Sequence, residues 1–174
     1  MDRLLQIDVV LVSVVILLWG IGLLALYSFS ESVGGNIYFG KQLVFGVMGL
    51  FLMFFVGSLD YRHFSRLSSF FYFLALGFLF LVLLFGSQIH GTMGWLSFGI
   101  FQIQPVEFVK LVLIIFLASF IAQKRSELGE WTRLIASLFL SMVLIFFVLK
   151  QPDLGSALVL AGIWLSMVIV SGIR

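Results

Sequence analysis

The sequence has no cysteine, only two prolines and few charged residues. Without cysteine it can form no disulfide, no thiolate nucleophile and no cysteine-ligated metal site. Charged residues make up 10% of the chain, whereas an ordinary soluble domain has about 25%. So few charged residues cannot cover the surface of a domain that faces water. A cytosolic enzyme, a DNA-binding module and a disordered segment are therefore excluded, and no nucleic-acid partner is expected.

The residues that are present are mainly hydrophobic, at 62% of 174 residues with a mean hydropathy of +1.22. A bilayer core about 30 Å thick requires about 20 apolar residues per helix. The apolar runs do not alternate with polar residues, which favours helices over strands. The sequence therefore predicts an all-α, polytopic transmembrane bundle forming a single domain over residues 1–174. Its six expected spans are 9–29, 43–59, 69–85, 105–122, 134–149 and 154–170.

The first apolar run is longer than the stretch of about 7–15 residues typical of a signal peptide, and no small-x-small cleavage site follows it. We therefore expect a retained helix. Lysine and arginine are concentrated on one side of the predicted spans, which the positive-inside rule assigns to the cytoplasm together with the N-terminus. That side carries Arg3, Arg62, Arg66, Lys124, Arg125, Arg133 and Arg174, whereas the other carries Lys41 and Lys150, and Lys110 lies inside a span.

One connection, residues 86–104, is long, rich in glycine and aromatic residues, and free of lysine and arginine. In the predicted topology it is an extracytoplasmic loop. Long connections of this kind are uncommon and often functional. Two interpretations remain open: an interfacial loop that caps the bundle, or a re-entrant flap that lines a cavity.

Two ionisable residues, Glu107 and Lys110, lie within a predicted span, where a charge costs about 2.5–3.5 kcal/mol. Pro105 suits the first turn of a helix because its missing N–H has no partner to lose there. Glu107 then falls in the first turn, where the helix dipole stabilises a carboxylate. Lys110 is three residues further on and shares its face, so the two side chains are predicted to pair.

A second motif, Gln151-Pro152-Asp153, repeats the glutamine-proline pair and again places an acid at the start of a helix. In the predicted topology both helices begin on the outer side. Glu107, Lys110 and Asp153 are therefore candidates for one cavity that opens away from the cytoplasm. The alternative is structural, with Asp153 only a helix cap and Glu107–Lys110 only a buried pair that fixes packing. Both interpretations remain open.

These motifs resemble a known family. Residues 91–99 (GTMGWLSFG), 104–110 (QPVEFVK) and 151–157 (QPDLGSA), with 41–43 (KQL) and 59–62 (LDYR), occur in an order similar to that of the SEDS family, which comprises RodA, FtsW and SpoVE proteins. The resemblance runs from near residue 20 to the end of the chain. The very short tail before the first span favours the RodA branch.

The resemblance implies a peptidoglycan glycosyltransferase of the elongation or division machinery, which governs cell shape. Such an enzyme polymerises lipid II on the outer face of the bacterial cytoplasmic membrane beside a class B penicillin-binding transpeptidase. It implies no certain cofactor and leaves open a divalent cation at the pyrophosphate. Under this resemblance the substrate cavity is lined by Glu107, Lys110, Asp153, Trp95, Gln104 and Gln151.

The chain departs from the family pattern in two respects. Family members have about ten spans, so this chain resembles an N-terminal portion, and the family's catalytic aspartate is expected beyond Arg174. No catalytic residue is therefore assigned, and the chain alone is expected to be inactive. Relatives often carry a cation just before the loop tryptophan, where this chain has Met93 and Gly94. A lipid-precursor flippase or other transporter, and a non-catalytic membrane scaffold, are the alternative functions.

Overall fold

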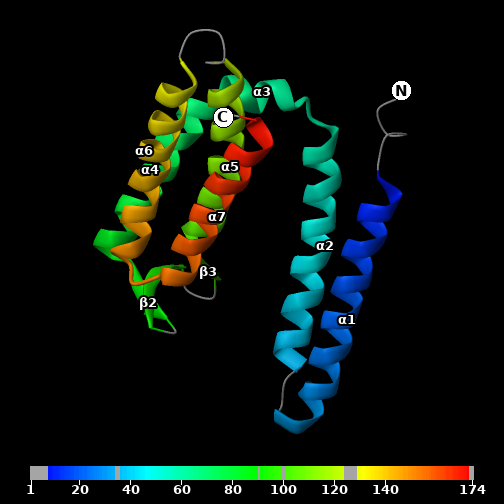
Figure 1. Ribbon diagram of the computed structural model, residues 1–174. Coiled ribbons are helices and arrows are strands. Elements are labelled where there is room, and N and C mark those ends of the chain that lie inside the picture. Colours follow the sequence, from blue (N-terminus) through cyan, green and yellow to red (C-terminus); the bar gives the residue numbers. More distant parts are fainter. Residues whose placement is uncertain (1–7, 34–35, 90, 99–100, 124–128, 173–174) are drawn as a thin grey trace. The chain divides into compact units, whose positions relative to one another are not determined.

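The computed structural model describes residues 8–33, 36–89, 91–98, 101–123 and 129–172 (Figure 1). Six helices in these ranges are long and apolar enough to cross a membrane, which confirms the predicted number of spans. Two of them begin earlier than predicted, at Tyr38 and Glu130, because polar residues at a membrane boundary can continue a helix whose backbone satisfies itself. The helices are α1 (Val9–Val33), α2 (Asn36–Ser58), α3 (Tyr61–Arg66), α4 (Ser68–Phe85), α5 (Pro105–Gln123), α6 (Glu130–Leu149) and α7 (Leu154–Ser171).

Contacts group the chain into two compact units, Met1–Asp60 and Tyr61–Arg174, and each is described by itself. That they form one domain stays a prediction. In the first unit, Asp8 caps α1 by accepting hydrogen bonds from the backbone N–H groups of Val10 and Leu11. Trp19 of α1 donates to the Gln42 carbonyl of α2 over 3.3 Å. Its ring occupies the space where a Cβ on Gly46 would lie, so the missing side chain lets the two helices approach.

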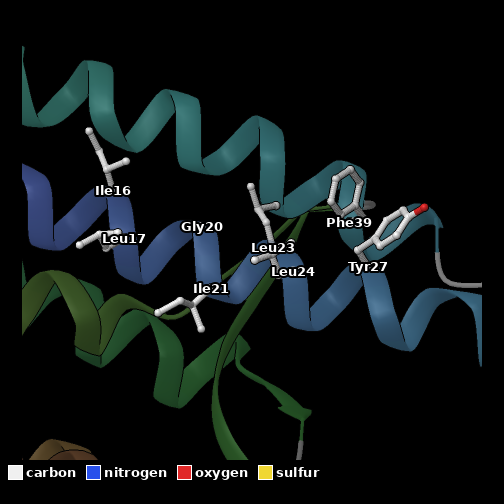
Figure 2. Close-up of a pocket in the computed structure, with 8 residues that line it drawn as sticks. All are labelled: Ile16, Leu17, Gly20, Ile21, Leu23, Leu24, Tyr27 and Phe39. Atoms are coloured by element: carbon white, nitrogen blue, oxygen red, sulfur yellow. The ribbon is translucent and has the colours of Figure 1, made fainter.

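A shallow groove of about 640 Å³ runs along this helical pair and is lined almost entirely by apolar atoms (Figure 2). The rings of Tyr27 and Phe39 meet edge to face at one end of it, with centroids 6.0 Å apart. Among the described residues that line the groove, Tyr27 alone has a polar side-chain atom. Its lining residues are Ile16, Leu17, Gly20, Ile21, Leu23, Leu24, Tyr27 and Phe39.

The second unit is a bundle in which α5 contacts α4, α6 and α7 (Figure 1). Half of the α5 span is buried, the largest share of any span described, so α5 is the central helix of this unit. Tyr72 on α4 stacks on Phe116 of α5 at 4.5 Å, and its hydroxyl donates to the Leu140 carbonyl of α6. A buried phenol requires such an acceptor. The bundle core includes Leu79, Val109, Leu113, Leu117, Leu144, Val148 and Leu160.

The sequence Asp60-Tyr61-Arg62-His63 leads into the short helix α3. Ser65 on α3 and Ser119 on α5 form a close hydroxyl pair, and the Ser119 hydroxyl also reaches the Ser65 carbonyl over 3.0 Å. These hydrogen bonds hold α3 against the C-terminal end of α5, which is the end away from Pro105.

The connection predicted as a loop contains three strands, β1 (Ser87–Ile89), β2 (Thr92–Phe98) and β3 (Phe101–Ile103). They pair antiparallel in the order β1-β2-β3, with Ser87 opposite Trp95 and Leu96 opposite Ile103. The bundle is all-α as predicted, and the connection contains a small antiparallel sheet that the sequence did not predict. Backbone groups near lipid need hydrogen-bond partners, and a small sheet supplies them within the segment. His90 and Gly99 lie outside the described residues.

Candidate functional site at the start of α5 and α7

The first side of the site is the beginning of α5. The helix starts at Pro105, as predicted, and Glu107 lies in its first turn. Lys110 pairs with Glu107, with 2.7 Å between Nζ and Oε1. The Glu107 side chain is 63% exposed and that of Lys110 21% exposed. The predicted ion pair is thus present, and its carboxylate is exposed in this chain. Whether the pair serves packing or a cavity stays a prediction.

The second side is the beginning of α7. Asp153 is the N-cap residue, and its Oδ1 accepts a hydrogen bond of 2.9 Å from the backbone N–H of Ser156. Asp153 is buried, with 8% of its surface exposed. This confirms the predicted cap. Because capping uses only one carboxylate oxygen, the other remains available for a second contact.

That second contact joins the two helix starts. The Gln104 side-chain amide donates to Asp153 Oδ2 over 3.2 Å, linking the residue before α5 to the cap of α7. The two glutamine-proline motifs therefore lie at the same end of the bundle, as their common position before a helix predicted. Glu107 and Asp153 consequently belong to the same end and not to opposite membrane faces.

Gln151 lies beneath this junction and is 1% exposed. Its side-chain amide donates to the Leu79 carbonyl of α4, and its main-chain carbonyl accepts from the Met93 N–H of β2. Through these bonds Gln151 connects α4, the sheet and the turn between α6 and α7. Its predicted place in the lining of a substrate cavity stays a prediction.

The sheet packs against the same junction through Gly94, which is buried. A Cβ on Gly94 would lie 3.5 Å from Gln151 Oε1 and 3.7 Å from Gln104 Nε2. These are ordinary van der Waals distances, so the backbone of β2 lies directly over both glutamine amides. Trp95, the next residue of β2, is half-buried. The segment predicted as either an interfacial cap or a re-entrant flap thus contacts the site through backbone and side-chain groups.

The partners of Gln151 were not predicted from the sequence. Both partners are main-chain groups, of Leu79 and Met93. Because nearly every residue carries such groups, the sequence does not indicate which of them a side chain contacts. The repeated glutamine-proline pair was the available signal that the two glutamines share a location. At the other end of the bundle, Arg133 was assigned to a loop but lies in α6 and is 6% exposed. Arg3, Lys124, Arg125 and Arg174, which contributed to the charge count, lie outside the described residues.

The charges at this end are mixed. The starts of α5 and α7 each carry the positive end of a helix dipole, which the Glu107 and Asp153 carboxylates offset, and Lys110 adds a positive charge that is paired with Glu107. Within the described parts of the chain, no three His, Cys, Asp or Glu side chains gather to hold a metal ion. The divalent cation therefore stays a prediction, and so does a shared cavity formed by the six candidate residues.

The fold and this site define a class: a multi-pass α-helical membrane protein with a small sheet packed on the paired starts of two helices. Residues 9–174 match the FtsW/RodA/SpoVE family, described as cell cycle protein. The chain belongs to this family. That confirms the resemblance carried by the motifs around Trp95, Gln104 and Gln151.

Several relatives are similar over nearly the whole chain. Stage V sporulation protein E of Bacillus subtilis is 33% identical over 96% of this chain and 48% of its own length. Peptidoglycan glycosyltransferase RodA of Treponema pallidum is 34% identical over 95% of this chain and 39% of its own. The chain thus spans less than half the length of these two relatives.

Solved structures agree with the fold. A point mutant of the rod-shape-determining protein RodA from Thermus thermophilus superposes with a TM-score of 0.83 at 31% identity, covering 98% of this chain and 55% of that one. A structure described as a peptidoglycan synthase complex that coordinates polymerisation and crosslinking contains a chain that matches with a TM-score of 0.80 at 29% identity. That match covers 97% of this chain and 48% of the other.

Proposed function

We propose that this chain is the amino-terminal part of a peptidoglycan glycosyltransferase that polymerises lipid II. The observation that carries the proposal is the Gln104–Asp153 hydrogen bond, which brings two helix starts together beside Lys110. In this reaction a sugar hydroxyl attacks the anomeric carbon of a lipid-linked sugar, and undecaprenyl pyrophosphate leaves. Positive charge near the leaving pyrophosphate lowers the barrier.

Within this proposal Lys110 contacts the pyrophosphate, and the exposed Glu107 orients the lysine ammonium. Asp153 and Gln104 keep the starts of α5 and α7 together, and Gln151 holds the sheet on them. The general base comes from the part of the longer protein that follows residue 174, as the family resemblance implies. None of these residues is assigned as that base, because Asp153 is already engaged as a cap.

The proposed setting is the bacterial cytoplasmic membrane with the N-terminus in the cytoplasm and the sheet on the outer face. Two observations support it: the lysine and arginine distribution, and membership of a family in which relatives are named peptidoglycan glycosyltransferases. The matched synthase complex couples polymerisation with crosslinking. That coupling supports a class B penicillin-binding transpeptidase as the partner.

Lipid II polymerisation by the purified longer protein tests this proposal. Lys110→Met should abolish glycan strand formation while the protein keeps its unfolding temperature, because the pyrophosphate loses its cation. Lys41→Met, which replaces an exposed lysine of α2, is the matched control and should leave polymerisation intact. The 174-residue chain alone should make no strands.

Three results would contradict the proposal. Full polymerisation by Lys110→Met would remove the role of the site. Movement of unpolymerised lipid II across vesicles, without strand synthesis, would indicate a flippase. A longer protein that neither polymerises nor moves lipid II, yet still binds the transpeptidase, would indicate a scaffold.

A further inference from the structure

A second feature lies at the other end of the bundle, in the first turn of α6. Arg133 is 6% exposed, and its Nε has no hydrogen-bond partner among the residues that the structure describes. A buried cationic donor without an acceptor is costly, because it has lost its hydration without replacement. Such a group is expected to be retained where it binds an anion that completes its hydrogen bonds.

The helix around Arg133 provides further donors. The N-cap of α6 is Gly129, which has no side chain, and no side-chain cap hydrogen bond is formed there. The backbone N–H groups of Glu130, Trp131 and Thr132 therefore have no partner within the helix. Side chains on a helix lean toward its N-terminus, which is the direction of this same turn. The arginine and the uncapped amide groups therefore belong to the same end of α6.

The next two turns of α6 on the same helix face are buried in the bundle. Ser137 and Ser141 follow Arg133 on the same helix face, and both are fully buried. Ser137 accepts a hydrogen bond from the indole of Trp164 on α7 over 3.2 Å, and Ser141 donates to the Ser137 carbonyl. The buried serines below Arg133 are therefore hydrogen-bonded within the bundle and leave the first turn of α6 as the place for a ligand.

The position of Arg133 at the end of a span indicates which anions are available to it. Arg133 lies in the first turn of the span Glu130–Leu149, at the level where a membrane meets water. Trp131 beside it is 72% exposed, as is typical of aromatic side chains at the headgroup level. Phosphate groups of lipids are the abundant anions at this depth. Glu130, an exposed acid in the same turn, disfavours a diffuse anionic surface, so any binding there must be local to the arginine.

We propose that Arg133 and the uncapped first turn of α6 bind a single phosphate group of an anionic membrane lipid. The guanidinium supplies a planar fork that an ammonium cannot replace. This site is separate from the start of α5 and α7 and does not depend on glycosyltransferase activity.

Lipid binding to the purified 174-residue chain tests the proposal. The chain is placed in nanodiscs of phosphatidylcholine alone or of phosphatidylcholine with phosphatidylglycerol, and retained lipid is counted by native mass spectrometry. Arg133→Lys should lower phosphatidylglycerol retention about tenfold, as expected for the loss of a charge-assisted hydrogen bond. Arg66→Lys, which replaces an exposed arginine of α3, keeps the same net charge and should bind like the unaltered chain.

A second measurement distinguishes the sources of phosphate and guards against misfolding. Phosphatidylglycerol should raise the unfolding temperature of the unaltered chain, and inorganic phosphate should not, because the lipid chains hold the headgroup at the site. Equal retention by Arg133→Lys, or an equal loss in Arg66→Lys, would overturn the proposal. A response to inorganic phosphate alone would replace the lipid by a free anion. An Arg133→Gln chain that is more stable in both lipids, with an unchanged phosphatidylglycerol response, would show an unpartnered charge with no ligand.

Discussion

The side-chain amide of Gln104 donates to Asp153 Oδ2 over 3.2 Å, across a separation of 49 residues. Asp153 accepts at the same time from the Ser156 backbone, so one carboxylate both caps α7 and fastens it to the start of α5. Two short motifs that are distant in the sequence thus become one polar junction, and the sheet rests on it. Three predictions concern this junction and the packing around it, and a fourth concerns the contact between α1 and α2 in the first unit.

Replacing Asp153 by alanine should lower the free energy of unfolding by about 2 kcal/mol, at the upper end of the range for a lost helix cap. The loss is large because Gln104 also loses its acceptor. Chemical unfolding in detergent measures it. Asp8→Ala, which removes a comparable cap from α1, is the control and should cost less, about 1 kcal/mol or below. Equal effects would show that the Gln104 bond contributes nothing.

Replacing Gln151 by leucine should destabilise the chain by about 1–3 kcal/mol, because the Leu79 carbonyl would remain buried without its donor. The sheet should also loosen, and faster amide exchange at β2 would report that. Gln102→Leu, at an exposed position of β3, offers the same change without a buried partner. It should leave both the free energy of unfolding and the amide exchange rates of β2 nearly unaltered. If the β2 amides of Gln151→Leu exchange as slowly as those of the unaltered chain, this account is contradicted.

Gly86→Ala should disturb the passage from α4 into β1. A Cβ there would overlap the Met93 and Val82 carbonyl oxygens, which are backbone atoms that cannot move aside independently. A cost of about 1–3 kcal/mol, typical of overpacking, is expected in the unfolding free energy. Gly77→Ala lies inside α4 with open space around it and should be neutral or stabilising by up to about 1 kcal/mol. A neutral Gly86→Ala would show that this turn is not closely packed.

Gly46→Ala should separate α1 from α2 in the first unit, because the added methyl group would overlap the Trp19 ring. The expected cost is again about 1–3 kcal/mol. Combining it with Trp19→Ala should recover part of the loss, and a double-mutant cycle on unfolding free energies measures that coupling. Gly49→Ala, on the same helix in open space, is the control. Additive effects of the two substitutions would contradict the contact.

Much of the candidate site could be predicted because its features are local. The start of α5 at Pro105, the Glu107–Lys110 pair and the Asp153 cap each depend on residues within one helical turn. The sheet was missed because its strands are short and pair through backbone groups. The burial of Arg133 was missed because a basic residue near a predicted span end is ordinarily exposed.

By itself the sequence determined the membrane class, the number of spans and the family, since apolar run length and short motifs are properties of neighbouring residues. Only the tertiary structure decided that Gln104 meets Asp153, that Gln151 is buried under the sheet and that Arg133 is buried with an unsatisfied donor. Burial and hydrogen-bond partnership depend on which helix faces meet. In helices that are apolar on every side, residue periodicity does not reveal those faces.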